Sequence, residues 1–94
     1  MGGVYGTITI QNLSSVPLTV KAYTAGTTSL VDTLTIGTGN SNSAFFTLNN
    51  TANYDITIIA GGKQTPITNV NCLYNPLYNI SVSASGVITY VKAN

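Results

Sequence analysis

The chain has 94 residues, a single cysteine, three basic and two acidic side chains, and a net charge of +1. This length predicts one domain spanning residues 1–94, and the single cysteine excludes a disulfide within the chain. No basic patch is present for nucleic acid or an anionic membrane, and no run approaches the roughly 20 apolar residues that span a bilayer.

The first strand is predicted at residues 4–11, where apolar and polar side chains alternate. This alternation places Val4, Ile8 and Ile10 on one face and Tyr5 on the other. Alternation with a period of two recurs in almost every later segment, and helical periodicity nowhere reaches two turns. We therefore expect an all-β chain.

The later strands are expected at residues 18–24, 30–36, 43–48, 54–60, 65–72, 78–83 and 87–92. In the second of these runs, Leu30 should lie on the same side as Asp32. The run that contains Pro66 should form a sheet edge, because proline cannot donate to a central ladder. Gly61 and Gly62 indicate a hairpin turn, and residues 83–86 indicate the turn of a closing hairpin.

Seven or eight short strands, with turn signals roughly every ten residues, are typical of a single small β-sandwich. The sequence leaves two versions open, jelly-roll and Ig-like, and both would contain antiparallel strands. Most of the runs provide one apolar face, which two packed sheets require.

Charged residues make up 5% of the chain, against roughly 25% in an average soluble domain. So little charge cannot keep apart monomers in which 44% of residues are hydrophobic. We expect a Thr, Ser and Asn surface that copies of the chain cover, that glycans decorate, or that suits conditions in which charge is a handicap. Because few groups titrate, stability should depend little on pH.

Catalysis is excluded by the residues that the chain lacks. It has no histidine, the usual general base for a Ser or Cys nucleophile. Asp32 and Asp55 are the only acids, and both fall inside strands without supporting residues. One cysteine without histidine cannot form a zinc site within one chain. We therefore expect no enzyme activity, no cofactor and no metal site.

The densest apolar loop spans residues 72–78, and it could be an assembly contact or a plug for the core. Its Cys72 is expected to be a small buried hydrophobe, with pairing to another chain as the alternative. Tyr5 and Tyr23 fall on the polar sides of their strands, which favours exposure. The residues expected at an assembly contact are Val4, Tyr5, Ile8, Ile10, Tyr74, Leu77 and Tyr78.

Three Asn-x-Ser/Thr sequons, at Asn12, Asn49 and Asn79, are candidate glycosylation sites if the host glycosylates exported proteins.

The leading hypothesis is a structural subunit that joins copies of itself into an extracellular or virion-associated filament, or tiles a shell. Residues 2–11 could be donated to a neighbour's sheet, where Val4, Ile8 and Ile10 would fill its core, and residues 87–92 are the alternative donor. One alternative is a carbohydrate-binding or adhesin module that uses Tyr5, Tyr23 and the loop at residues 72–78. Another is a viral capsid or decoration protein of the jelly-roll type.

Overall fold

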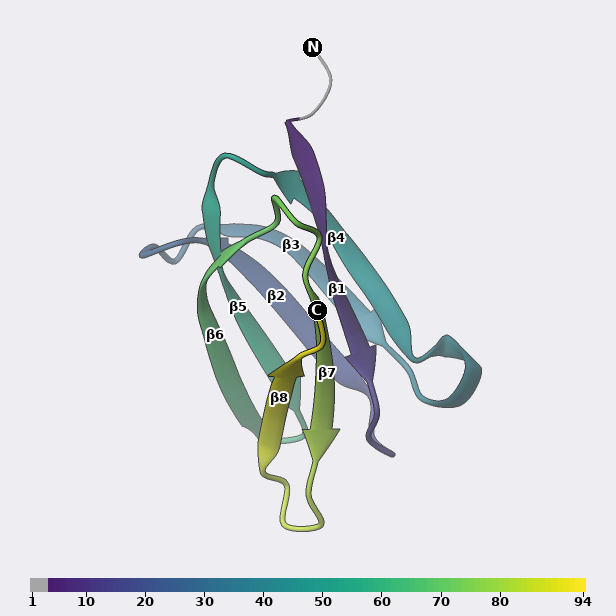
Figure 1. Cartoon of the computed structure of the whole chain (residues 1–94). Helices are drawn as coiled ribbons and strands as arrows, with labels where there is room; N and C mark the ends of the chain where they lie inside the picture. Colours follow the sequence, from purple (N-terminus) through teal and green to yellow (C-terminus); the bar gives the residue numbers. More distant parts are fainter. Residues whose placement is uncertain (1–3) are drawn as a thin grey trace.

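A computed structural model of the chain describes residues 4–94 and forms a sandwich of two four-stranded sheets (Figure 1). The strands are β1 (Tyr5–Asn12), β2 (Leu18–Thr24), β3 (Leu30–Ile36), β4 (Ser43–Asn49), β5 (Asn53–Ala60), β6 (Lys63–Asn71), β7 (Leu77–Val82) and β8 (Ile88–Lys92). A short 3-10 turn, Gly39–Ser41, precedes β4. The predicted β-sandwich is confirmed.

The first sheet has the strand order β4-β1-β7-β8, and the second has the order β3-β2-β5-β6. Alternate residues of the central strands point into the space between the sheets. Ile8 and Ile10 of β1, and Ile56 and Ile58 of β5, are completely buried there. The alternation seen in the sequence therefore becomes one apolar layer shared by both sheets.

Strand β1 is a central strand, lying between β4 and β7 (Figure 1). It is antiparallel to β4 but parallel to β7. The expectation of antiparallel strands throughout is corrected at this one pair. Parallel neighbours need a long connection, and here the five strands from β2 to β6 lie between the two partners.

Two hairpin turns lie where the sequence predicts them. Gly61 and Gly62 connect β5 to β6, and Gly61 has a φ of 60°, which suits glycine at the first position of a tight hairpin. Residues 83–86 connect β7 to β8. The Pro66 strand, β6, is an edge strand as expected.

A bulge in the β2–β3 pair corrects the expected orientation of Leu30. The register places Ala22 opposite Asp32 but Tyr23 opposite Leu30, so one residue of β3 is skipped. Leu30 therefore shares a face with Tyr23, and it is 54% exposed.

No helix within residues 4–94 has the length and apolar character needed to cross a bilayer.

Candidate functional site

The side chains of β1 belong mainly to the chain's own core. Ile8 and Ile10 are fully buried, whereas Tyr5 is 68% exposed on the outer face of the first sheet. Val4 is half-buried, and its carbonyl oxygen accepts a hydrogen bond from the Asn50 N–H at 2.7 Å. Ile8 and Ile10 are thus inaccessible in the folded subunit, and their role as assembly contacts stays a prediction. Donating this segment would require exchange, in which a subunit gives up its own β1.

The loop at residues 72–78 is divided between core and surface. Cys72 is completely buried, which fits the small buried hydrophobe, and Tyr78 is 8% exposed. Tyr74 is 85% exposed, while Leu77 is half-buried on the outer face of the first sheet. One part of the loop therefore plugs the core, whereas Tyr74 faces solvent; a role of the loop as an assembly contact stays a prediction.

The same loop crosses directly over β1 at Gly6. A Cβ atom at Gly6 would overlap the carbonyl oxygen of Cys72 and lie 2.9 Å from its carbonyl carbon. Asn75 fixes the crossing, because its Oδ1 accepts hydrogen bonds from the backbone N–H of Thr7 at 2.9 Å and from the Thr7 hydroxyl at 3.2 Å. Close approach of two backbones is a role that only glycine can fill here.

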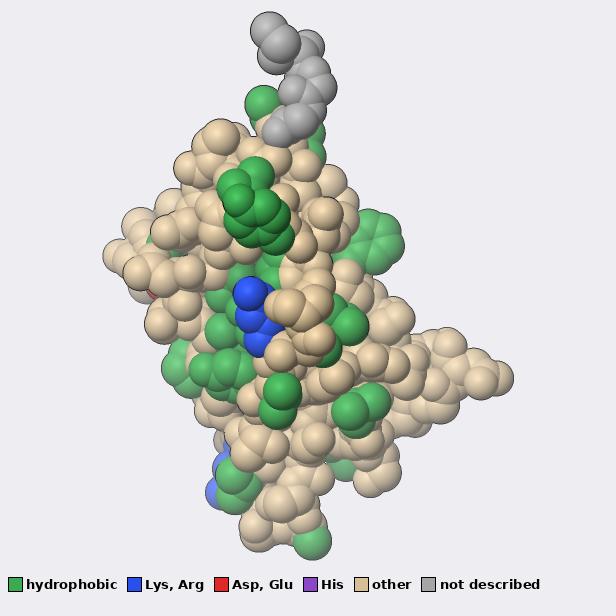
Figure 2. Space-filling view, in the orientation of Figure 1, with side chains coloured by type: hydrophobic (Ala, Val, Ile, Leu, Met, Phe, Trp, Pro, Cys, Tyr) green, Lys and Arg blue, Asp and Glu red, His purple; other side chains and the backbone are tan. Residues whose placement is uncertain are grey.

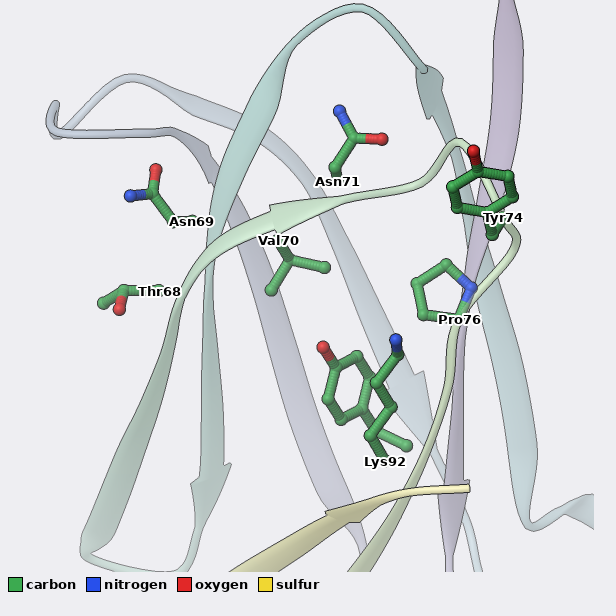
Figure 3. A pocket seen from close by; sticks show the side chains of 8 residues that line it. Thr68, Asn69, Val70, Asn71, Tyr74, Pro76 and Lys92 are labelled. Carbon is green, nitrogen blue, oxygen red and sulfur yellow. The ribbon is translucent and has the colours of Figure 1, made fainter. Parts of the chain in front are cut away.

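A hollow of about 440 Å³ opens beside this loop, between β6 and the end of β8 (Figure 3). Lys92 projects into it between Val70 and Pro76, and Tyr74 stands at its rim (Figure 3). Tyr78 also lines the hollow. Apolar and aromatic walls around one cation are suited to a small polar ligand with an apolar face.

Tyr78 is paired with Tyr90 in an edge-to-face arrangement, with ring centroids 6.0 Å apart. Burial raises the pKa of the Tyr78 hydroxyl, and proximity to Tyr90 raises it further. The hydroxyl in the hollow is therefore neutral at physiological pH and can act as a hydrogen-bond donor.

The two aspartates are not arranged as a catalytic pair. Asp32 pairs with Ala22, which points inward, whereas Asp55 pairs with Tyr23, which points outward. The two carboxylates therefore lie on opposite faces of the second sheet, and no cleft is shared between them. Within residues 4–94, no three Asp, Glu, Cys or His side chains group as metal ligands.

Asp55 instead ties together three separate segments. Its carboxylate accepts hydrogen bonds from the backbone N–H of Gly26 at 2.9 Å and of Asn69 at 3.0 Å. These donors hold the pKa of the Asp55 carboxyl below its usual range. The role of this acid is structural, since it joins β5 to the β2–β3 turn and to the bulge of β6.

The three sequons differ in their accessibility. Asn12 is 2% exposed, and its Nδ2 donates to the carbonyl oxygens of Val16 at 2.7 Å and Gly37 at 3.2 Å. The fold leaves no room for a glycan there, so Asn12 is corrected from a glycosylation candidate to a buried structural amide. Asn49 is exposed at the end of β4. Asn79 is half-buried, and its Oδ1 is buried without a hydrogen-bond partner among the described residues.

The surface combines little charge with many exposed apolar side chains. Figure 2 shows one face, where hydrophobic groups are scattered over polar side chains and backbone with few charges between them. The large hydrophobic residues that are exposed are Tyr5, Leu13, Val16, Leu30, Val31, Phe45, Leu73, Tyr74, Val87, Tyr90 and Val91. They come from strands of both sheets and from loops.

The four edge strands of the two sheets are β3, β4, β6 and β8. Unpaired N–H and C=O groups at such edges can pair with another chain, unless a charge, a proline, a bulge or a short length prevents it. Strand β6 has Pro66 and a bulge opposite Asp55, and β3 has a bulge and the exposed, charged Asp32. Strand β8 has five residues and ends at Lys92. Strand β4 has none of these features.

Comparison with protein-family models and with curated proteins finds no match for this chain.

Sequence reasoning missed three features of this surface. The open edge of β4 was missed because the order of strands in a sheet is not a local property. The hollow beside Lys92 was missed because its walls come from three segments. The crossing at Gly6 was missed, although a glycine inside an alternating strand already indicated a special backbone position.

Proposed function

We propose that this chain is a structural subunit that assembles with copies of itself, by addition or exchange of β-strands between neighbours. The observation that carries the proposal is the combination of an unprotected edge strand, β4, with a surface that holds only five charged residues. An open edge offers a ladder of hydrogen bonds to another chain, and a net charge of +1 offers almost no repulsion against it.

Addition at an edge and exchange of β1 differ in what they require of the subunit. Addition leaves the sandwich intact, because β4 already has its side chains in the core. Exchange would remove Ile8 and Ile10 from the core of one subunit and replace them with those of another. We favour addition, since it needs no unfolding of a central strand.

A setting outside the cell or on a virion suits these properties. Only two carboxylates and no histidine can couple folding to pH, and a surface of Thr, Ser and Asn is indifferent to ionic strength. Assemblies in such settings meet changing pH and salt without the protection of a cytosol.

The test is negative-stain electron microscopy of the purified chain, together with light scattering from pH 3 to pH 8. Regular fibres or shells that persist over this range are the expected result. A monomer at every pH and at every concentration tested would overturn the proposal.

A carbohydrate-binding or adhesin module is the second candidate, favoured by the hollow beside Lys92. Tyr74 could stack on the apolar face of a sugar, while the Lys92 ammonium and the Tyr78 hydroxyl bond to its hydroxyl groups. A glycan array probed with the wild type and with the Tyr74→Ala variant tests it. Binding by the wild type that the variant loses would support this function, and no binding by the wild type would end it.

A further inference from the structure

The free side of β4 presents a short and well-defined set of backbone groups. Two hydrogen bonds fix which residues point toward β1: Asn50 N–H to the Val4 oxygen, and Asn12 N–H to the Asn42 oxygen. Because paired and unpaired positions alternate in an antiparallel ladder, the even-numbered residues of β4 are bonded to β1. The odd-numbered residues direct their N–H and C=O groups away from it.

Four odd-numbered residues lie in β4, and one of them is already engaged. The Asn49 N–H donates to the Tyr54 hydroxyl at 3.2 Å, and the Asn49 oxygen accepts from the Ala52 N–H at 3.3 Å. Ser43, Phe45 and Thr47 remain. Among the described residues, no hydrogen bond engages their backbone groups on the free side. The open ladder is therefore three alternate residues long and centred on Phe45.

We propose that β4 pairs antiparallel with β4 of a second copy about a two-fold axis at Phe45, giving one continuous eight-stranded sheet. This inference rests on the proposed function and names its first junction. In this register Ser43 faces Thr47 of the second copy, Phe45 faces Phe45, and Thr47 faces Ser43. All three open positions thus fall in hydrogen-bonded pairs, and the ladder has six main-chain hydrogen bonds.

The side chains of β4 are complementary in the same register. On the outer face the two Phe45 rings lie across the axis, and a Ser–Thr pair lies on each side of them. On the inner face Ala44 lies opposite Phe46 of the other copy, so a small residue meets a large one twice. None of the seven residues of β4 is charged, so like charges do not face each other anywhere along the junction.

The occupant of this edge is a second copy rather than another protein because the strand matches itself. A two-fold junction needs residues that pair with their own sequence in reverse, and 43–47 does so at each position. Such a contact is isologous and closes as a dimer. The dimer is then the building unit, and growth of a filament uses a second surface.

The first experiment compares Phe45→Lys with Val91→Lys by sedimentation equilibrium over a range of protein concentrations. Both side chains lie on the outer face of the first sheet with similar exposure, 59% and 65%, but on its opposite edge strands. We expect Phe45→Lys to weaken dimerisation at least about ten-fold, through lost ring contact and facing charges. Val91→Lys should dimerise like the wild type. Thermal unfolding by circular dichroism verifies that both variants fold.

The results of this comparison distinguish a failure of the β4 junction from a failure of the proposed function. If the wild type is a monomer at every concentration, both fail. If the wild type assembles and Phe45→Lys assembles equally well, the β4 junction is wrong while self-assembly stands. Loss of assembly in Val91→Lys alone would move the junction to β8.

Disulfide trapping tests the register. In the proposed pairing the Cα atoms at position 45 are about 5.5 Å apart, within the range of about 4.4–6.8 Å that a disulfide spans. The two copies of position 47 are roughly 13 Å apart along the strands. Under mild oxidation, Phe45→Cys should form covalent dimers and Thr47→Cys should not. Cross-linking of Thr47→Cys without cross-linking of Phe45→Cys would refute the register.

Discussion

Two backbones cross at Gly6, so even the smallest side chain at this residue should destabilise the fold. In Gly6→Ala the new methyl group would overlap the Cys72 carbonyl oxygen, with the carbonyl carbon at 2.9 Å and the Cys72 Sγ at 3.3 Å. The carbonyl cannot rotate away easily, because its oxygen accepts a hydrogen bond from the Asn75 N–H at 3.1 Å. The Asn75 side chain also accepts a hydrogen bond from the Thr7 N–H, which holds the loop at residues 72–78 against β1.

The expected cost of Gly6→Ala follows from two opposing terms. Forcing a methyl group into a filled site costs about 3 kcal/mol when the obstacle is backbone rather than a flexible side chain. Replacing glycine reduces the entropy of the unfolded chain, which returns about 0.4–1 kcal/mol. The free energy of unfolding should therefore fall by about 2 kcal/mol or slightly more. For a domain of this size that corresponds to a decrease in Tm of about 8–16 °C.

The assay is thermal and urea unfolding followed by circular dichroism, with all proteins at the same concentration, because self-association would add to apparent stability. Gly62→Ala is the matched control. No atom lies within 4 Å of a Cβ at Gly62, and its φ is outside the left-handed region. Its stability should stay within about 0.5 kcal/mol of the wild type. Equal melting temperatures for Gly6→Ala and Gly62→Ala would refute the proposed steric role.

Four further outcomes are expected. Asn12→Ala should lower the free energy of unfolding by about 1–3 kcal/mol, because the carbonyl groups of Val16 and Gly37 lose the donor of two partly buried hydrogen bonds, and mass spectrometry should find no glycan on Asn12 in any host. The folded-state pKa of Asp55 lies below its ordinary value of 3.8, so the stability that its carboxylate contributes is complete above about pH 4 and is lost as pH falls through the folded pKa. Urea unfolding should show that the free energy of unfolding falls less steeply in acid for Asp55→Asn than for the wild type. Cys72 should react with a thiol reagent only in denaturant, since it is fully buried. Tyr74→Ala should leave Tm unchanged within about 2 °C, because 85% of this side chain is exposed.

Local patterning was enough to predict the strands themselves. Alternation placed a strand at residues 18–24 and another at 30–36, and the structure has the same bounds for β2 and β3. Pro66 correctly indicated an edge, because the lack of an N–H group is a local property with a direct consequence for pairing. Paired glycines likewise indicated the β5–β6 turn.

Properties that depend on pairing could not be read from the same patterns. Nothing in residues 4–11 distinguishes a strand donated to a neighbour from a central strand of the chain's own sheet, since both require one apolar face. The parallel β1–β7 pair joins segments about 70 residues apart in sequence, and the loop before β7 crosses β1 at Gly6. The bulge that turns Leu30 outward needs knowledge of the partner strand.

The sequence suggested which types of residue would form the candidate site, but not where the fold would place them. From the low charge we expected a surface that associates, which stays a prediction. Of the tyrosines expected at contacts, Tyr5 and Tyr74 are exposed and Tyr78 is buried. Asn12 shows why the rest could not be foreseen. A sequon and a buried amide that caps two backbone carbonyls look identical in sequence, and only the tertiary contacts of the loop after β1 separate them.

The distribution of protective features over the edges gives the low charge a physical meaning. A chain that relied on electrostatic repulsion to stay monomeric would need charge on every open strand, and this chain has five charged residues in all. Asp32 lies on β3, and Lys63 and Lys92 lie on β6 and β8, so three of these five are on edge strands. Together with the bulges and Pro66, they protect three edges and leave β4 open. In the assembly that we propose, this unequal protection directs association to one edge, as an ordered assembly requires and non-specific aggregation lacks.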